Sequence, residues 1–569
     1  MVKSSAAVRV TAFLVCSAVL TACGGDGGSG STGSTGSTTS TPPTAASPPP
    51  TQADATRFLE QATFGPTASD ITLVQTEGFD AYLTTQFKTP KTGYTGFSYV
   101  PHTAPATCQY SSSAPTSVAS LCSRDNYSAF QVQRQFFANA QAGQDQLRQR
   151  VAFALSQIMV VSAADVYEAY GLAAYQNLLL DDAFVNFRQL LNDITLSPAM
   201  GRYLDMVNNA KANPAQGTAP NENYARELMQ LFTLGVYLLN PDGSQQHDSS
   251  GNPIPTYDQA AVEGYAALFT GWTYPPLSGT ATFNEAVNYT GQMTLIDAQH
   301  DTGAKQLING VTLPAGQSGA QDLQAGLDAI FNHPNVGPFI ATRLIQHLIT
   351  SNPSPAYVQR IAAVFNNDGQ NVRGDMQAVI QAILLDPEAR GNSKSDANYG
   401  HLREPALFVS AFIRSVGGQS DGVYPRSQSS AMGQNVFDAG SVFNFYPPDY
   451  VVPARTDLGP EFAIQGAATA LARVNFVNQL VYNGGAPPDT TVTGSTGTSL
   501  DLTTWINAAG DADGLVTALD ARLTHTTLVS AAHQSIVVAI DAYDPTDTTS
   551  RAEQAVYLFG ASPQYQVER

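Results

Sequence analysis

The chain has 569 residues, of which 43% are hydrophobic and 13% are charged, and its formal net charge at pH 7 is −19. This acidity argues against nucleic acid and anionic lipid headgroups as partners, because both favour basic protein surfaces. The large apolar fraction and the small charged fraction predict a well-packed globular body for most of the chain.

The amino terminus has the layout of an export signal. Lys3 and Arg9 precede an apolar run at residues 10–20, which is too short to span a bilayer and is followed by small residues. The tetrapeptide LTAC at residues 20–23 resembles the bacterial lipobox, in which the signal is cleaved just before a cysteine that becomes acylated.

The lipobox resemblance implies that residues 1–22 are a lipoprotein signal peptide and that the Cys23 thiol carries acyl chains, palmitate among them. Each buried acyl CH₂ contributes about 0.8 kcal/mol, so two or three chains hold a protein firmly. We expect an exported protein that binds the lipid bilayer of a cell-envelope membrane through Cys23 and faces the periplasm or the cell exterior. The alternative is an ordinary cleaved signal in which Cys23 is incidental, and the protein is then released as a soluble species.

Residues 23–53 are rich in Gly, Ser, Thr and Pro. Such a segment buries too little apolar surface to offset its ordering entropy, so we expect a flexible, lipidated tether. Farther along, Cys108 and Cys122 flank a turn-rich segment. An even cysteine pair in an exported chain predicts a disulfide, whereas a metal or redox role needs more ligands or a tight Cys-x-x-Cys.

The body of the chain is predicted to be mainly α, a multi-helix globular body with irregular loops and minor β-hairpin insertions. Three short helices are expected at 54–64, 68–78 and 79–88. Many longer stretches then place apolar residues three and four positions apart, which favours antiparallel helical packing. Residues 240–255 contain Asp-Gly and Ser-Gly turns that indicate a hairpin, and residues 273–315 suggest short strands or loop.

The stretch PNENYARELMQLFTLG at residues 220–235 predicts an amphipathic helix with a polar arc and a broad apolar face. Asn221 can cap this helix, and Glu222 and Arg226 are spaced four residues apart, as in a helical ion pair. A solvated helix face explains these charges without any function. A working site is the other interpretation.

Long motifs carry a family resemblance. Besides 220–235, they are RFLEQATFGPT (57–67), RQRVAFALSQIMVVS (148–162), SPAMGRYLDMVNNAKANP (197–214), FTGWTY (269–274), HDTGAKQLING (300–310) and the terminal YLFGASPQYQVER. Together they resemble the bacterial domain-of-unknown-function 1800 family. The resemblance runs from about residue 54 to the carboxyl end, so we assign 54–480 to the mainly helical family domain and 481–569 to its helical C-terminal segment.

The resemblance implies an exported, mostly helical envelope protein and no established catalytic residues. Gly264 and Tyr265 depart from the plainer helix that family members usually show at this point. The family-like motifs nevertheless supply polar or aromatic candidates for a catalytic or binding site: Lys211, Glu222, Asn223, Arg226, Glu227, Trp272, His300, Asp301 and Lys305. Two helical carboxylates near a His-Asp pair suit acid–base chemistry or a divalent cation, and neither the cofactor nor the metal is specified.

Other signals favour structural roles. Residues 418–422 match G-x-S-x-G, but we expect a helix before the serine and a long irregular loop after it, which does not fit a nucleophile elbow. His333 is interpreted as a helix boundary, and His347 as a core histidine within an apolar helix. Asp511 begins a calcium-like sequence that we interpret as a helix-entry turn.

Residues 417–460 form a long stretch with little periodicity, and loops of this length are often functional. Phe443, Phe445, Tyr446 and Tyr450 either pack onto the helical core from outside or offer flat apolar faces to a sugar or a partner protein. Asn444 and Asp449 are their hydrogen-bonding neighbours.

Two function classes follow from the sequence. The first is an envelope binding or assembly component that engages another exported protein or a glycan. The second is an extracytoplasmic hydrolase or transferase that uses the Glu222 to Glu227 helix and the His300-Asp301 segment. An enzyme requires these groups to be buried and to converge in a cleft, whereas an assembly protein can leave them apart and exposed.

Overall fold

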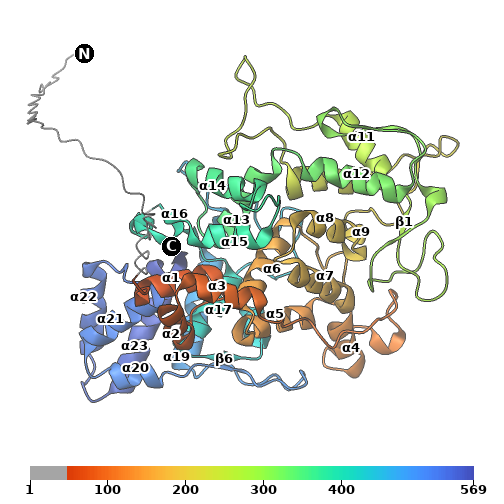
Figure 1. Ribbon diagram of the computed structural model, residues 1–569. Coiled ribbons are helices and arrows are strands. Elements are labelled where there is room, and N and C mark those ends of the chain that lie inside the picture. The colour runs from red at the N-terminus through yellow and green to blue at the C-terminus, as the bar shows by residue number, and fades with distance from the viewer. Residues whose placement is uncertain (1–47, 397) are drawn as a thin grey trace, which may run out of the picture. The chain divides into compact units, whose positions relative to one another are not determined.

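The computed structural model describes residues 48–396 and 398–569 (Figure 1). The predicted signal peptide, the predicted lipidation site at Cys23 and most of the predicted tether therefore lie outside the described residues. Residues 49–569 pack as one unit, in which helices predominate over a few two-stranded sheets. The prediction of a mainly α fold is confirmed. Within the described ranges, no helix combines the length and apolar character needed to cross a bilayer.

The first third of the unit contains nine α-helices. They are α1 (Gln52–Ala62), α2 (Ala68–Glu77), α3 (Phe79–Lys88), α4 (Val118–Asn126), α5 (Phe130–Ala142), α6 (Gln146–Ile158), α7 (Ala169–Asp182), α8 (Phe187–Thr195) and α9 (Pro198–Tyr203). The three short helices expected at the start are confirmed within about two residues. Thr51 caps α1 through its side chain, and Thr67 forms a capping box with Asp70 at the start of α2.

The middle third alternates helices with irregular segments. Its helices are α10 (Asn223–Glu227), the π-helix η2 (Leu228–Thr233), α11 (Gln259–Leu268), α12 (Gly319–Phe331), α13 (Val336–Leu348), α14 (Pro355–Asn366), α15 (Met376–Leu385) and α16 (Pro387–Arg390). Bridges join Tyr237 to Pro255 and His247 to Pro253, which confirms the hairpin. Two small sheets pair β1 (Trp272–Thr273) with β2 (Thr294–Leu295), and β3 (Lys305–Gln306) with β4 (Thr312–Leu313).

The last third closes onto the first. Its helices are α17 (Pro405–Val416), α18 (Val423–Ala431), α19 (Ala467–Tyr482), α20 (Thr503–Ala508), α21 (Ala512–Leu523), α22 (Ser530–Asp541), α23 (Thr548–Ala561) and α24 (Pro563–Gln566). Strand β6 (Gln419–Ser420) pairs with β7 (Thr498–Ser499). Along the whole unit, short 3-10 turns lie at Ala106–Cys108, Asp297–Gln299, Ile308–Gly310, Asn392–Ser395 and Pro460–Ile464. Helices α1 and α21 pack against each other, so the two ends of the unit are neighbours (Figure 1).

The carboxyl end is held in the interior. Strand β5 (His401–Leu402) pairs antiparallel with β8 (Val567–Glu568), so that His401 lies opposite Glu568. Arg57 of α1 donates from Nε to the carbonyl oxygen of Arg569 at 2.9 Å. The last residues are therefore part of the packed unit.

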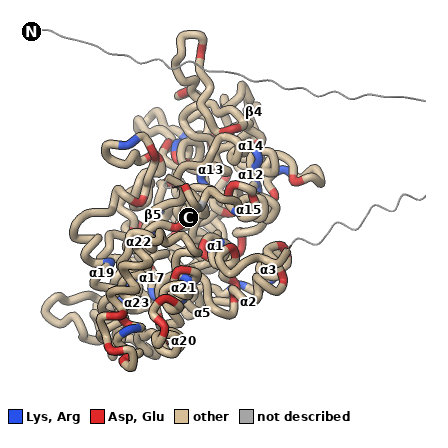
Figure 2. The backbone as a smooth tube through the Cα atoms, turned by 90° about the vertical axis from the view of Figure 1, so that its left-hand side faces the viewer, with Lys and Arg blue, Asp and Glu red and all other residues tan. Residues whose placement is uncertain are grey.

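The core lies around α6 and α17. Every residue of α17 is buried, which agrees with its apolar sequence PALFVSAFIRSV on all sides of the helix. All of α6 except Arg148 is buried as well. Acidic and basic positions are spread over many surrounding elements, as Figure 2 shows.

The stretch at 220–235 differs from the single α-helix that we expected. It starts as α10 and changes at Leu228 to the π-helix η2, in which the Leu234 N–H donates to the Met229 carbonyl five residues back at 2.9 Å. The side chain of Thr233 also bonds back to the Leu228 carbonyl at 2.5 Å. The apolar spacing of 3.6 residues that predicts an α-helix does not show where a side chain will compete for a backbone carbonyl and widen the turn. Short π-helical segments frequently accompany functional sites.

The expectation of a long loop after Ser420 is wrong. Strand β6 precedes α18, so the order of elements is that of a nucleophile elbow. However, the Ser420 hydroxyl bonds to the Thr498 hydroxyl at 2.7 Å and accepts the Gly422 N–H at 3.1 Å. These bonds hold the β6–β7 pair and the turn, which is a structural role.

Candidate functional site

The exposed charges of α10 form a surface network. Arg226 donates to Glu222 at 2.5 Å, which confirms the predicted ion pair, and Gln259 of α11 bonds to both side chains. Asn221 accepts the Asn223 N–H at 2.8 Å, but the residue at the N-cap position of α10 is Glu222, one residue later than predicted. Surface ion pairs of this kind contribute well under about 1 kcal/mol. This part of the stretch matches the solvated-face interpretation.

Glu227 differs from its neighbours on α10. Its Oε2 atom is buried and accepts no hydrogen bond from the described residues. Burial raises the pKa of this carboxyl, and the nearby Arg226 partly opposes that effect. Asn223 bonds weakly to Asp205 at 3.4 Å. Glu227 thus has a buried, unpaired carboxyl oxygen and is not a member of the surface network.

His300 and Lys305 belong to a buried ion cluster. His300 is 1% exposed, and its Nε2 lies 3.0 Å from Oδ2 of Asp322. The Nζ atom of Lys305 lies 2.7 Å from the same oxygen and donates to the Asp301 carbonyl at 2.5 Å. Oδ2 of Asp322 is shared by His300 and Lys305, whereas its Oδ1 is buried without a hydrogen-bond partner among the described residues. We interpret the cluster as a structural tie between α12 and the 300–306 segment.

Lys211 and Trp272 belong to the framework that joins these motifs. The Lys211 N–H donates to the Gln299 carbonyl at 2.9 Å, while its side chain is exposed. The Trp272 carbonyl accepts the Asn208 N–H at 2.7 Å, and its indole Nε1 is buried without a partner among the described residues. The family-like motifs therefore meet around residues 205–211 through backbone contacts.

The two groups of candidates do not converge on one cleft. Gln259, at the start of α11, contacts Glu222 and Arg226, whereas His300 binds the carbonyl of Thr270 beyond the end of that helix, at 3.0 Å. No described contact joins the α10 carboxylates to His300 or Asp301. Nor do the described residues contain three or more His, Cys, Asp or Glu side chains arranged to hold a metal ion.

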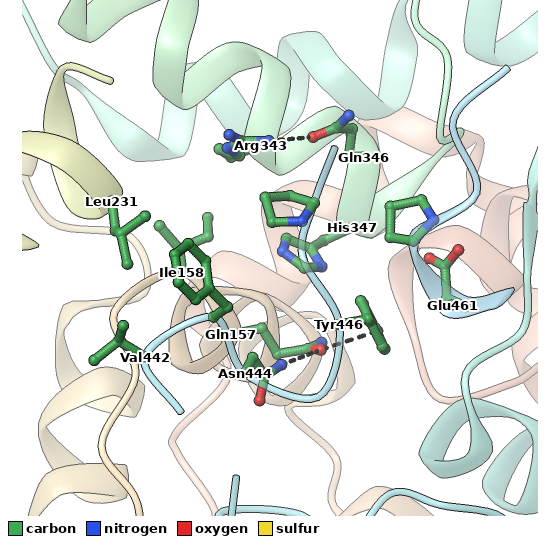
Figure 3. Close-up of a pocket in the computed structure, with 13 residues that line it drawn as sticks. Gln157, Ile158, Leu231, Arg343, Gln346, His347, Val442, Asn444, Tyr446 and Glu461 are labelled. Carbon is green, nitrogen blue, oxygen red and sulfur yellow. Dashed lines mark hydrogen bonds between the residues drawn. The ribbon is translucent and has the colours of Figure 1, made fainter. Parts of the chain in front are cut away.

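A pocket elsewhere in the fold combines polar and apolar walls. It encloses about 570 Å³ of empty space, including its open mouth, and Figure 3 shows its lining side chains. The lining comprises Gln157 and Ile158 at the end of α6, Leu231 of η2, Arg343, Gln346 and His347 of α13, and Val442, Phe443, Asn444, Tyr446, Pro448, Pro460 and Glu461 of the later chain. Only about 40 Å³ of this space admits water-sized groups, so a ligand larger than a few water molecules extends into the open mouth.

The floor of the pocket is a hydrogen-bonded set around Glu404. Glu404 is buried and precedes α17, and it accepts from Gln157 at 3.1 Å, from Tyr446 at 2.9 Å and from Gln434. Asn444 donates to Oε1 of Gln157 at 3.0 Å. Burial raises the pKa of Glu404, and the neighbouring Arg150 and these donors oppose the rise. The floor is rigid because each of its groups has a partner.

Helix α13 places two basic side chains in the pocket. Arg343 and His347 are one turn apart, and Arg343 donates to Gln346 at 3.0 Å. Burial lowers the pKa of His347 to about 3, and Arg150 and Arg343 lower it further. Burial also lowers the pKa of Arg343, to about 10. Near neutral pH His347 is therefore uncharged and Arg343 is charged.

One end of the pocket is closed by Glu461. Its carboxyl is 4% exposed and lies 3.4 Å from Nδ1 of His401, whose Nε2 lies 3.6 Å from Glu568. Although burial opposes it, the two carboxylates raise the pKa of His401 to about 9. The Oε2 atom of Glu461 accepts no hydrogen bond within the described part of the chain.

The opposite side of the pocket is apolar. Figure 3 shows Leu231, Ile158 and Val442 together, across from His347 and Glu461. Phe443 adds an aromatic ring that remains 44% exposed. Leu231 reaches this wall from η2. The 220–235 stretch, whose charged side chains are candidates for a site, therefore contributes an apolar residue to the pocket and none of these charged side chains.

The predicted aromatic segment has a mixed outcome. Tyr446 is buried and bonded to the core, as expected for aromatic packing, whereas Phe443 lines the pocket. Phe445 and Tyr450 are half-buried. His347, interpreted as a core histidine, also lines the pocket. His333 lies between α12 and α13 and Asp511 caps α21, so both of those structural interpretations are confirmed.

Sequence reasoning missed Gln157, Arg343, Gln346, Glu404 and Glu461. The only usable signal was an Arg and a His four residues apart within an apolar helix, which places both on one face. The remaining residues come from segments that no local pattern links. Cys108 and Cys122 form the expected disulfide.

The fold and the pocket define a mainly helical protein with an open pocket of mixed polarity. Residues 57–567 match the family model described as "Protein of unknown function (DUF1800)". The chain belongs to this family. Neither the curated proteins nor the solved structures contain a significant match to it.

Proposed function

We propose that this chain is a binding component of the cell envelope, anchored through Cys23, that holds a small hydroxyl-bearing molecule such as a sugar. One observation carries the proposal. The Oε2 atom of Glu461 is buried in the pocket wall without a donor among the described residues. A buried polar atom left unpaired costs about 1–3 kcal/mol, so a ligand hydroxyl or amine that donates to it would recover that energy.

The rest of the wall suits a sugar ring. A pyranose has an apolar C–H face and a rim of hydroxyl groups. The apolar side, with Leu231, Ile158 and Phe443, fits the face, whereas Gln346, Asn444 and Glu461 fit the rim. Ligand sites generally combine an apolar lining with a few placed polar groups.

The protonation states favour binding over acid–base catalysis. A general base works best when its pKa lies near the working pH, but His347 has a pKa of about 3. Glu404 already accepts three hydrogen bonds from neighbouring side chains. Neither group is therefore well suited to take a proton from a substrate at neutral pH.

Titration of the purified protein with glucose, N-acetylglucosamine and glucosamine in a calorimeter tests the pocket. We expect at least one of these sugars to bind, and Glu461→Gln and Phe443→Ala each to weaken its binding about tenfold, the loss of one good contact. Glu263→Gln and Tyr482→Ala, on exposed helix faces, are matched controls that keep full affinity. If none of the three sugars binds, or if the controls lose as much affinity as the pocket variants, the proposal fails.

The anchor is tested separately. Cys23→Ser should move the protein from the membrane fraction to the soluble exported fraction, because the acyl chains are lost. An unchanged membrane fraction would leave the pocket proposal standing but would remove the anchor at Cys23.

A further inference from the structure

A second and larger hollow lies away from the pocket, on the side of the unit formed by residues 95–98, α4, α5 and the start of α7. It encloses about 1350 Å³, including open solvent. Its walls include Phe97, Asp125, Gln131, Arg134, Gln135 and Tyr170. We call it the α4–α5 groove. No residue of this groove lines the pocket around Glu461.

The walls of the α4–α5 groove are held in place before any ligand arrives. Asn177 bonds to both the N–H and the carbonyl of Tyr94, at 2.9 and 2.8 Å, and Gln135 accepts the Thr95 N–H at 3.2 Å. The disulfide between Cys108 and Cys122 ties the segment before α4 to the helix that carries Asp125. A preformed site loses less entropy on binding.

The opposite rim is also fixed. The Asp421 carboxylate accepts hydrogen bonds from Ser495, Thr496 and Gly497, at 2.5, 2.8 and 2.9 Å. These bonds hold the loop that brings Thr493 to the groove. Three of the segments that line the groove, at 95–98, α4 and the loop with Thr493, therefore each have their own anchor.

Planar polar side chains dominate the floor of the α4–α5 groove. Arg134 donates to Gln131 at 3.3 Å, but its Nε is buried and has no acceptor within the described residues. Oδ1 of Asp125 accepts a hydrogen bond from Nε of Arg124 at 2.7 Å. A bound chain that offers oxygen acceptors would complete the hydrogen bonds of Arg134.

An aromatic surface lies beside these polar groups. The ring of Tyr99 is 41% exposed and meets Tyr170 edge-on, with the ring centroids 5.5 Å apart. Phe97 is half-buried at the same edge. Aromatic faces next to planar hydrogen-bonding side chains are what sugar rings require, because a ring presents C–H groups on its face and hydroxyls around it.

We propose that the α4–α5 groove binds an extended oligosaccharide. The groove is open at the surface and larger than the pocket, so it accommodates several sugar units in a row. A peptide that binds by strand addition fits less well, because the groove is lined by helices and loop rather than by an exposed strand edge. This inference is independent of the ligand proposed for the pocket.

Calorimetric titration of the purified protein with chitotetraose and with tetragalacturonate tests the groove, using a neutral and an acidic tetrasaccharide as probes. We expect one of them to bind, and Arg134→Gln and Phe97→Ala, both in the lining of the groove, each to weaken it about tenfold. Matched controls are Arg455→Gln and Tyr110→Ala, whose side chains are exposed outside the groove, and Phe443→Ala in the pocket. Each variant is first checked for an unchanged thermal transition.

The two probes distinguish the chemistry that Arg134 recognises. Preference for tetragalacturonate assigns a carboxylate to Arg134, and preference for chitotetraose assigns a neutral acetamido or hydroxyl oxygen. Both results support an oligosaccharide site. The proposal is overturned if neither tetrasaccharide binds, or if Arg134→Gln and Phe97→Ala bind as tightly as the three controls.

Discussion

His401 lies with its Nδ1 atom 3.4 Å from Oε1 of Glu461, the carboxyl that closes one end of the pocket. The pair is almost fully buried, and Glu568 of the carboxyl-terminal strand approaches the other ring nitrogen at 3.6 Å. Strand β5, strand β8 and the pocket wall are thus joined by one protonated imidazole.

This arrangement predicts a specific pH dependence of stability. The pKa of His401 rises from an ordinary 6.5 to about 9 in the folded chain. A pKa raised by folding stabilises the protein below the unfolded pKa, and this stabilisation is lost as the pH rises through the folded pKa. At about 1.4 kcal/mol per unit, we expect a loss of roughly 3 kcal/mol between pH 6.5 and 9.

Urea unfolding at pH 6, 7, 8 and 9 measures this loss. His401→Gln should abolish the slope that the group contributes. His333→Asn is the control. Burial lowers the pKa of His333 to about 4, so the titration of His333 changes the unfolding free energy at acid pH. Equal slopes in the wild type and His401→Gln would contradict the ion cluster.

Gly264 should not tolerate a side chain. A Cβ atom at this position would lie 1.9 Å from the carbonyl oxygen of Gln306, because α11 packs directly on β3. We expect Gly264→Ala to destabilise the fold by about 3 kcal/mol, as overpacking against backbone does. Gly510→Ala, where a Cβ meets nothing within 4 Å, should change the unfolding free energy little. If both variants unfold at the same urea concentration, the close approach of α11 and β3 is wrong.

Asn444 should tolerate glycine better than alanine. Its φ of 62° lies in the left-handed region, which strains most side chains but not glycine. Both substitutions remove the bond to Gln157. We therefore expect Asn444→Ala to lose about 1 kcal/mol more unfolding free energy than Asn444→Gly. Chemical denaturation of the two variants makes the comparison, and equal or greater stability of the alanine variant would refute the left-handed backbone.

The disulfide should protect the segment that it encloses. Replacing both Cys108 and Cys122 with serine frees residues 109–121, which a closed loop restrains by on the order of 3 kcal/mol in the entropy model. We expect faster proteolysis within this segment, and the same acceleration when the wild type is reduced. The serine variant itself should not respond to reductant. Cleavage at an unchanged rate would show that the segment is held by its other contacts alone.

The sequence supports the local structure well. The sequence predicts α1 to α3 within about two residues, and the cysteine pair predicts the disulfide, because these features depend on residues close together in the chain. The change from α10 to the π-helix η2 depends on which backbone carbonyl Thr233 and Leu234 reach. That choice is made by packing, so spacing alone cannot predict it.

The pocket is harder to anticipate for the same reason. Gln157, Leu231, Arg343 and Glu461 are distant in sequence, and only the packing of α6, η2 and α13 with the 442–461 segment brings them together. The charged side chains of α10 lie on the surface, whereas Leu231 of the following π-helix η2 reaches the pocket. Glu461 in particular lies in an irregular stretch with no motif to mark it.

Native mass spectrometry of the protein extracted from its envelope tests the central claim most directly, because one spectrum reports both the amino terminus and any bound molecule. We expect a chain that starts at an acylated Cys23 and carries a small hydroxyl-bearing ligand, which Glu461→Gln and Phe443→Ala lose. A chain with its signal intact and no ligand, or a ligand retained unchanged by both variants, would contradict the account.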